Sequence, residues 1–393
     1  MATSSTEQND RNIITLVDRL LIRASAERAS DIHIEPRNET VRVRFRVDGV
    51  LVERPGFNLE QGASITSRLK IMSQLDISEK RLPQDGAFEF TINQVPVPFR
   101  VATFPTEYGE KLVVRVLSRA DAALSLERLG LSPDDLVTLR RVAQHQEGIV
   151  LVTGPTGAGK TTTMYALLHE LENTTRNITT LEDPIEYRFD SIIQGQVNTK
   201  IGFTFSQGLK AILRQDPDVI MVGEMRDAET AEIAFRAALT GHLVFSSLHT
   251  NSVIDSFVRL FDMGLERFVV ASALRAVIAQ RLVRRLCVNC SKPAPLSEVS
   301  RSLLGLSDSD EDIEVFEPVG CASCNQTGYF GRVGLYEILE IDDELTDLLK
   351  SQTLSRQVIR QELEKRSIRS LREAGRVQIL KGATSVDEVL RVT

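Results

Sequence analysis

Residues 148–165, GIVLVTGPTGAGKTTTMY, constrain the fold more than any other stretch of the chain. The stretch begins with IVLV, an apolar run rich in β-branched residues that is typical of a buried strand. Residues 154–161 match the pattern G-x-x-x-x-G-K-[ST] in full, and a helix is predicted from about Gly159 to His169 or Leu171. Because strand, loop and helix come in the required order, a phosphate-binding loop is favoured over a chance glycine turn.

This loop is predicted to bind phosphate through its backbone. Its glycines allow successive N–H groups to point inward, and the helix N-terminus adds free N–H groups and partial positive charge. Lys160 is predicted to reach the β- and γ-phosphates, and the Thr161 hydroxyl to bind Mg²⁺. The predicted nucleotide-binding residues of the loop are Gly154, Pro155, Thr156, Gly157, Ala158, Gly159, Lys160, Thr161 and Thr162.

The composition excludes several classes of protein. The 393 residues suggest two or three domains, and a formal net charge of -7 gives no basic excess for binding nucleic acid. No apolar run approaches the ~20 residues of a membrane span, and the polar residues 1–10 do not resemble a secretory signal. All four cysteines lie at 287–324 in two C-x-x-C pairs, which favours a reducing compartment and a metal site over disulfides.

Residues 11–117 are predicted to form a small α+β domain after a disordered start at 1–10. Residues 41–47 alternate apolar side chains with three arginines, and Asp48-Gly49 closes a turn, so a half-buried hairpin is expected. For these arginines a solvated face is favoured over a phosphate site. The other predicted elements are helices at 11–29 and 60–77 and strands at 86–92, 97–103 and 111–117.

A linker is predicted at 118–130, and an α/β domain occupies 131–393. Apolar strands and amphipathic helices alternate there, which is the pattern of a parallel sheet covered by helices. Ser132 and Pro133 begin the first helix as its N-cap and first helical residue. Further predictions are strands at 149–153, 178–182, 218–223 and 243–247, a loop-rich region at 291–318, and a mostly helical part at 340–393 with a capping box at Ser385 and Glu388.

Acidic side chains follow two of these strands. Residues 218–224, DVIMVGE, form an apolar strand that ends in Glu224, which can hold Mg²⁺ through water or orient an attacking water. Glu182, Asp183 and Glu186 crowd three carboxylates after another strand, which is costly unless a cation or proton uses them. A solvated acidic turn is the alternative for this group, and the phosphate loop elsewhere in the domain favours the catalytic interpretation.

Two histidines flank the predicted strand at 243–247. His249 follows the strand and could form a hydrogen bond to a γ-phosphate, whereas His242 precedes it. For either histidine a structural role is the more common one, and the residues alone do not favour a functional one.

The cysteine pairs predict a structural metal site. Two pairs can complete a tetrahedral thiolate site with no open position, and thiolates favour Zn²⁺. A redox pair is the alternative, and the presence of both pairs in one short segment favours metal. The predicted ligands are Cys287, Cys290, Cys321 and Cys324.

Taken together, these motifs resemble those of the secretion ATPase superfamily. They are GPTGAGKTT, TLEDPIEY, ILRQDPDVIMVGEMRD, TGHLVFSSLHTN and AQRLVRRLC with its paired cysteines. The chain is most similar to the type II secretion assembly ATPases, with the type IV pilus assembly ATPases close behind. The resemblance extends from SDIHIEP to DEVLRVT, which is nearly the whole chain.

The resemblance implies a RecA-like P-loop ATPase core behind a PAS-like α+β module, with a tetracysteine zinc subdomain and a helical C-terminus. It implies a homo-hexamer that binds ATP, Mg²⁺ and Zn²⁺, with nucleotide between domains and subunits. A mobile arginine can neutralise charge on the transferred phosphoryl group and couple closure to hydrolysis. The residues that the resemblance assigns are Glu224 as the Walker B acid, Glu182, Asp183 and Glu186 in an acidic box, His242 and His249 in a histidine box, Arg214 and Arg226 in the core, and Arg100 and Arg115 as first-domain arginines that reach the γ-phosphate.

The implied work is extension of a pseudopilus, driven from the cytoplasmic face of the inner membrane of a diderm bacterium with platform proteins as partners. Pilus assembly is the alternative within the class. A nucleic-acid motor is disfavoured by the acidic balance, and a non-enzymatic scaffold by the intact acids. Lys210 stands where relatives often carry arginine. The amino-terminal domain with which relatives dock to the platform is expected to be absent, in either a trimmed or a naturally short form.

Overall fold

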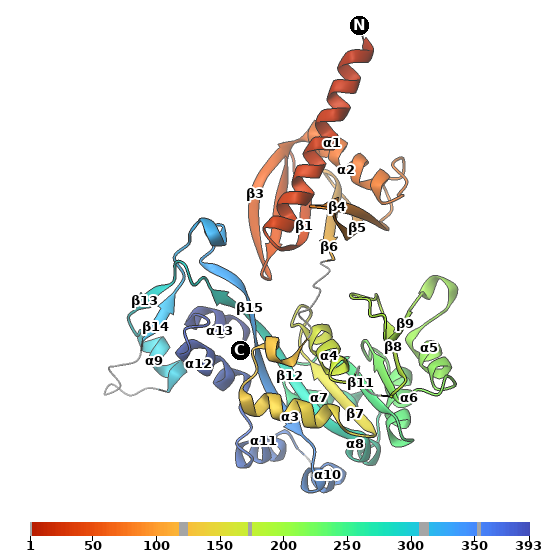
Figure 1. Cartoon of the computed structure of the whole chain (residues 1–393), viewed down its shortest axis with the longest axis vertical. Coiled ribbons are helices and arrows are strands. Elements are labelled where there is room, and N and C mark those ends of the chain that lie inside the picture. Colours follow the sequence, from red (N-terminus) through yellow and green to blue (C-terminus); the bar gives the residue numbers. More distant parts are fainter. Residues whose placement is uncertain (1, 118–124, 172–174, 306–313, 352–354) are drawn as a thin grey trace. The chain divides into compact units, whose positions relative to one another are not determined.

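The structure is a computed structural model that describes residues 2–117, 125–171, 175–305, 314–351 and 355–393. The chain divides into two compact units, Met1–Arg119 and Ala120–Thr393, and each is described by itself (Figure 1). Among the described helices, none combines the length and the apolar character needed to cross a membrane.

The first unit is an antiparallel sheet with two helices on one face (Figure 1). Its six strands lie in the order β3-β2-β1-β6-β5-β4. Val43 and Phe45 of β2 are fully buried against both helices, while Arg44 between them lies on the open face, as the strand period requires. The elements are α1 (Ala2–Ala26), β1 (Ala29–Pro36), β2 (Thr40–Val47), β3 (Val50–Asn58), α2 (Leu59–Met72), β4 (Gln84–Ile92), β5 (Val95–Thr106) and β6 (Gly109–Val116).

The hairpin predicted around residues 41–47 is confirmed. Its turn residues Asp48 and Gly49 have φ angles of 49° and 89°, which are left-handed values that glycine and aspartate tolerate. On the open face, Arg44 forms an ion pair with Glu35 at 2.8 Å. The hairpin arginines therefore belong to a solvent-facing surface that neighbouring carboxylates cross-link.

The first helix is longer than predicted. Disorder is predicted for residues 1–10, whereas α1 begins at Ala2. The segment contains several serine, threonine and asparagine residues, which favour turns over helix interiors. A helix that is already nucleated gains one hydrogen bond for each residue it adds, so a polar flank can extend it.

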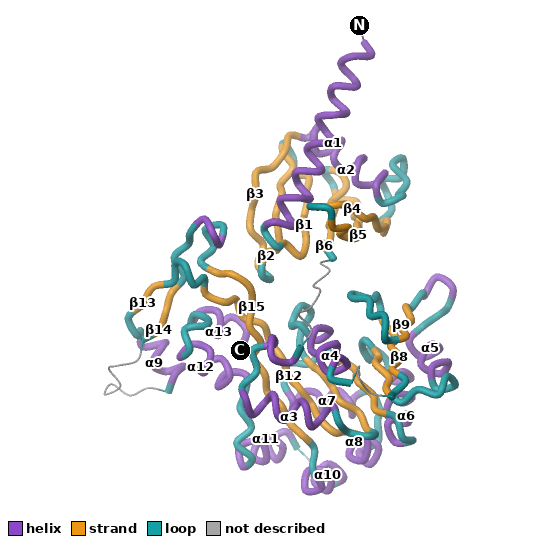
Figure 2. Tube along the Cα trace, in the orientation of Figure 1, coloured by secondary structure: helices purple, strands orange, loops and turns teal. Residues whose placement is uncertain are grey.

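The second unit contains a seven-stranded sheet in the order β15-β12-β7-β11-β10-β8-β9. All neighbouring pairs are parallel except β12 with β15. Figure 2 shows helices alternating with the parallel strands along the chain. The strands are β7 (Gly148–Thr153), β8 (Ile178–Glu182), β9 (Ile193–Gln196), β10 (Val219–Val222), β11 (Leu243–Leu248), β12 (Leu274–Leu286) and β15 (Tyr329–Glu340).

Helices cover both faces of this sheet. Val150 and Val152 of β7 pack against α3 and α4, and Ile149 and Leu151 pack into the core formed with α6 to α8. Because both faces are covered, the central strands β7 and β10 are largely continuous apolar runs. The helices are α3 (Pro133–Ala143), α4 (Lys160–His169), α5 (Phe205–Ile212), α6 (Ala228–Leu239), α7 (Val253–Asp262), α8 (Arg267–Ala273), α9 (Glu298–Leu304), α10 (Asp343–Lys350), α11 (Arg356–Lys365), α12 (Leu371–Leu380) and α13 (Val386–Val392).

The sequence predicts four of the seven strands of this sheet correctly; it misses the edge strand β9 and the neighbouring pair β12 and β15. The segment between these two strands carries the cysteines, and the region predicted as loop-rich at 291–318 contains the short pair β13 (Lys292–Ala294) and β14 (Val315–Glu317), together with α9. The linker predicted at 118–130 lies partly outside the described residues and ends in a short 3₁₀ helix at Leu126–Leu129.

The capping box predicted at the last helix is only half formed. Ser385 accepts a hydrogen bond from the backbone N–H of Glu388, as predicted. The Glu388 carboxylate does not return to the N-cap; it is almost fully buried and pairs with Arg284 of β12 and with Arg391. This buried ion-paired carboxylate anchors the end of the chain to the central sheet.

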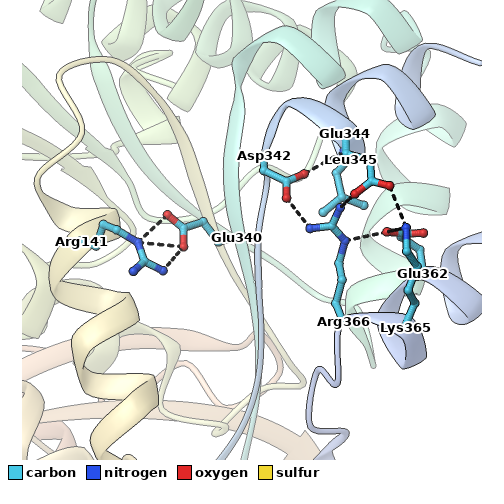
Figure 3. A network of polar contacts seen from close by, with 8 residues as sticks. All are labelled: Arg141, Glu340, Asp342, Glu344, Leu345, Glu362, Lys365 and Arg366. Carbon is cyan, nitrogen blue, oxygen red and sulfur yellow. Dashed lines mark hydrogen bonds and ion pairs between the residues drawn. The ribbon is translucent and has the colours of Figure 1, made fainter.

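Ion pairs and hydrogen bonds connect α10 and α11 in the helical C-terminal part (Figure 3). Arg366, which follows α11, bonds to Asp342 at the N-cap of α10, to Glu344 at 2.9 Å and to Glu362 at 2.7 Å. Lys365 adds a second bond to Glu344 at 2.7 Å. Since most of these carboxylates are exposed, they orient α10 and α11 and contribute little stability individually.

Candidate functional site

The phosphate loop lies at the carboxyl edge of the parallel sheet. β7 pairs with β11 on one side and β12 on the other, so the loop that follows it emerges from the middle of the sheet. The N–H of Gly154 donates to the carbonyl of Leu248, the last residue of β11, at 3.3 Å. Ligands of open α/β sheets bind at this edge, outside the carboxyl ends of the strands.

Two glycines of the loop are required by the backbone. Gly159 has a φ of +86° and precedes α4, a conformation that a side chain would strain. A Cβ on Gly154 would lie 2.6 Å from the carbonyl oxygen of Gln280 on β12, closer than packed atoms approach. The glycine pattern therefore serves both the curl of the loop and the close approach of the neighbouring strand.

Lys160 begins α4 and lies back over the loop. Its ammonium donates to the carbonyl oxygens of Gly154 at 2.8 Å and Pro155 at 3.2 Å. Burial lowers the pKa of Lys160 to about 8, and the charges of Glu224 and Glu186 only partly oppose this effect. The hydrogen-bond acceptors of this ammonium are these two backbone carbonyls, so an anion that reached it would stabilise its charged form.

Glu224 forms a hydrogen-bonded cluster next to this lysine. It follows β10, accepts from His249 Nε2 at 3.0 Å, and pairs with Arg226. Arg226 also lies 3.6 Å from a carboxylate oxygen of Asp183. Burial alone would raise the pKa of Glu224, but the hydrogen bonds from Arg226 and His249 outweigh it and lower that pKa, so this acid stays ionised.

The three acids at 182–186 occupy different environments. Glu182 is 2% exposed and accepts from Tyr165, from Thr180 at 2.6 Å and from Gln194 at 3.1 Å. Burial raises the pKa of Glu182. These contacts favour a positioning role for Glu182 over the predicted catalytic one. Glu186, by contrast, acts on Lys160 and so lies near the loop.

Several predicted residues lie apart from this cluster. His242 precedes β11, so it lies at the opposite edge of the sheet, where its Nδ1 is 2.9 Å from the carbonyl of Ala237. Arg214 is exposed after α5 and donates to the carbonyl of Lys210 at 2.8 Å. A structural role accounts for His242, while the role of Arg214 stays a prediction.

Arg100 and Arg115 belong to the first unit. They face each other directly in the β5–β6 ladder, so two like charges lie side by side on the sheet. Asp31 of β1 pairs with Arg115, with Nε at 3.0 Å from the carboxylate. Their approach to a nucleotide stays a prediction.

The residues alone did not identify Gln280 and Arg281 of β12, although both flank the phosphate loop. Gln280 is 1% exposed and Arg281 is 8% exposed. The run AQRLVRRLC is notable only as part of the family resemblance, and nothing in its local pattern predicts that these two polar side chains are buried. Their burial depends on hydrogen-bond partners that are distant in the sequence.

The four cysteines converge as predicted. Their sulfur atoms all lie within 4.8 Å of one another, with Cys287 and Cys321 at 3.9 Å and Cys290 and Cys324 at 3.8 Å. Backbone N–H groups already point at two sulfurs, from Gly328 to Cys324 at 3.2 Å among others. All four are free thiols, so the donor set fits a tetrahedral Zn²⁺.

Comparison with known proteins places this arrangement among secretion proteins. A family described as "Type II/IV secretion system protein" matches residues 6–391. The "Type II secretion system protein E" of Aeromonas hydrophila is 47% identical over 385 residues, which cover 98% of this chain and 76% of that protein. The "Type II secretion system ATPase E" of Vibrio cholerae serotype O1 is 46% identical over 386 residues, with the same coverage of 98% and 76%. Among solved structures, the pilus retraction motor PilT with bound ADP superposes with a TM-score of 0.63 at 26% identity, covering 95% of this chain and 96% of that one.

Proposed function

The chain belongs to the type II/IV secretion system protein family, and from this premise we propose that it is an Mg²⁺-dependent ATPase that powers pseudopilus assembly in type II protein secretion. The observation that carries the proposal is the convergence of Lys160, Glu224, His249 and Arg226 at one edge of the sheet. These side chains supply a cation for phosphate, an ionised acid, and groups that orient that acid.

The phosphate loop binds the triphosphate. Its N–H groups and the N-terminus of α4 hold the phosphate oxygens, and Lys160 leaves its two carbonyl acceptors for the β- and γ-phosphates. The Thr161 hydroxyl, in the first turn of α4, would hold Mg²⁺, which neutralises charge on the phosphates.

Glu224 or Glu186 orients the attacking water. Glu224 is ionised and oriented by His249, so it can accept a hydrogen bond from water. Glu224 shares the Arg226 guanidinium with Asp183, and a change in that pairing would reorient Glu224. Arg100 and Arg115 of the first unit supply further positive charge to the transferred phosphoryl group when the units close.

We propose a homo-hexamer at the cytoplasmic face of the inner membrane, with the platform proteins of the secretion system as partners. Family membership supports this assembly. The net charge of -7 speaks against nucleic acid as a partner. The sulfur cluster holds Zn²⁺ as a structural ion, because four thiolates leave no open position for a substrate.

The test of the ATPase is phosphate release by Lys160→Ala and Glu224→Gln proteins. We expect Lys160→Ala to lose nucleotide affinity and turnover together, because it removes the phosphate-binding cation. Glu224→Gln should retain nucleotide binding and lose turnover, because an amide cannot take the role of the ionised acid. An unchanged rate in both variants would refute the proposal.

Pilus assembly is the alternative function; the solved structure of a pilus retraction motor shows that a similar fold also acts on pili. The two are separated by deleting the gene in its host and restoring it with wild-type or Glu224→Gln protein. Loss of secreted proteins with intact surface pili supports secretion. Loss of pili with normal secretion supports the alternative.

A further inference from the structure

Strand β12 extends past the end of its neighbour. Its parallel ladder with β7 runs from Leu274, opposite Ile149, to Ala279, opposite Thr153, where β7 ends. β12 itself continues to Leu286 (Figure 1). On the β7 side, the residues that come next on β12 therefore lie beside the phosphate loop, while on the other side they stay paired with β15.

Gln280 is the first of these residues, and it contacts both ends of the loop. Its carbonyl oxygen lies beneath Gly154, and its side-chain nitrogen lies 2.9 Å from the position of a Cβ on Gly159. Its Oε1 accepts a hydrogen bond from the Thr163 hydroxyl of α4 at 2.8 Å. One buried residue thus packs against the entry to the loop through its backbone carbonyl and bonds to the helix after the loop through its side-chain amide.

Arg281 is the second residue and points to the opposite face of the strand. One terminal nitrogen of its guanidinium donates to the Asn251 carbonyl at 2.9 Å and to the Asn251 side-chain oxygen at 3.1 Å. Its Nε donates to the carbonyl of Val392 at 3.2 Å. Asn251 closely follows His249, which bonds to Glu224, so Arg281 fixes the turn that carries this histidine.

Among the residues that the structure describes, no carboxylate bonds to the buried charge of Arg281. All its hydrogen bonds go to carbonyl oxygens, and the nearby acids Glu337 and Asp255 act on it only through space. Burying a cation in this way is costly unless an anion compensates for it. Its second terminal nitrogen lies 3.5 Å from the position of a Cβ on Gly154, which places the charge directly behind the loop.

We propose that Gln280 and Arg281 are positioning residues of the ATPase site. Gln280 fixes the phosphate loop to α4. Arg281 holds the His249 turn against the loop and provides a fixed positive charge behind the bound phosphates. This inference rests on the proposed function, because it assigns roles within that site.

The test separates the charge of Arg281 from its geometry. Arg281→Lys keeps the charge but has a single nitrogen, so it cannot keep the contacts that three guanidinium nitrogens make with Asn251, Val392 and Gln280, whereas Arg281→Met loses the charge and the contacts. Arg275→Met is the matched control, because Arg275 lies at the other end of the same strand, near the opposite edge of the sheet. For each purified full-length protein, the Kd for Mg-ADP, the kcat and the KM for ATP are measured.

We expect Arg281→Met to weaken Mg-ADP binding about tenfold and to lower kcat. Arg281→Lys should restore Mg-ADP affinity and leave kcat low, because charge returns while the His249 turn stays loose. A purely structural role would not produce this split. Equal Mg-ADP affinity in Arg281→Met, Arg281→Lys and Arg275→Met would overturn the charge role, and wild-type kcat in Arg281→Lys would overturn the positioning role.

Thr163→Val provides an independent test if Arg281→Met does not fold. It removes the hydroxyl that donates to Gln280 and that also bonds to Tyr336, and it preserves the branched side-chain shape. We expect weaker Mg-ADP binding together with a lower Tm, because the buried Oε1 of Gln280 loses its donor, and wild-type affinity would contradict the role of Gln280. Failure of the proposed function is recognised separately, because wild-type protein would then show no hydrolysis at all.

Discussion

Nucleotide binding should become weaker at alkaline pH because of Lys160. Burial lowers the pKa of this lysine to about 8 in the nucleotide-free site. Bound phosphates favour the charged form and return the pKa towards its ordinary value of about 10.4. Binding then requires the protonated lysine, and affinity is lost as the pH rises through the pKa of the free site.

The magnitude follows from the two pKa values. At about pH 9, one unit above the free-site pKa, roughly nine in ten molecules carry a neutral lysine, which weakens binding about tenfold or by about 1.4 kcal/mol. At about pH 7 the loss is negligible. Binding should also take up close to one proton per nucleotide at the higher pH and almost none at the lower.

The assay is isothermal titration calorimetry with Mg-ADP at both pH values, in two buffers of different ionisation enthalpy. Lys160→Arg is the control, because its guanidinium stays protonated over the whole range. Its affinity should be nearly independent of pH, and circular dichroism checks that both proteins stay folded. Equal wild-type affinity at the two pH values, without proton uptake, would refute the reasoning.

Two further predictions concern buried groups away from the phosphate loop. We expect wild-type protein to bind close to one Zn²⁺ per chain, and Cys324→Ser to lose the metal and have a lower Tm, because three thiolates hold the ion poorly. Metal analysis of the purified variant tests this prediction, and wild-type metal content would contradict it. Burial raises the pKa of Glu337 to about 7, so the stability it contributes below its unfolded pKa is lost as pH rises through 7. Glu337→Gln should therefore raise the free energy of unfolding by up to about 3 kcal/mol near pH 8 and hardly at all near pH 5, as measured by urea unfolding. An equal effect at both pH values would disprove the role of Glu337 ionisation.

The phosphate loop was predictable because its chemistry is local. Anion binding by a loop requires a strand, a glycine-rich turn and a helix N-terminus in sequence, so the residues that perform it are contiguous. The hairpin at Asp48 and Gly49 was predictable for the same reason, since its turn residues and its alternating strands adjoin one another.

Strand β12 was missed because its buried polar residues obscure the apolar pattern of a central strand. Gln280 and Arg281 are buried through hydrogen bonds to Thr163 and Asn251, and the first of these partners is 117 residues away in the sequence. A local pattern cannot reveal that such a partner exists. The same limit applies to Glu388, whose carboxylate is bound by Arg284 and not by its own N-cap.

The acids at 182–186 show a finer limit. The sequence predicts a single acidic group from Glu182, Asp183 and Glu186, because they are neighbours along the chain. The strand ends at Glu182, so this side chain is directed into the core towards Tyr165, while Asp183 meets Arg226. The direction of the side chain at the last residue of a strand decides whether an acid is buried in the core or lies in an exposed site. The spacing of the acids in the sequence does not reveal this direction.

The cysteine cluster also bears on how the chain reaches its native fold. β12 and β15 are neighbours in the sheet, and Leu286 pairs with Tyr329 across an insertion of roughly 40 residues, whose closure costs about 2 kcal/mol more in entropy than a tight turn. An ion that bound Cys287 and Cys321 before the strands pair would shorten the loop that has to close. Metal supply during synthesis would then govern the speed with which the outer edge of the sheet assembles, so scarcity of zinc would delay maturation even of molecules that later become fully stable.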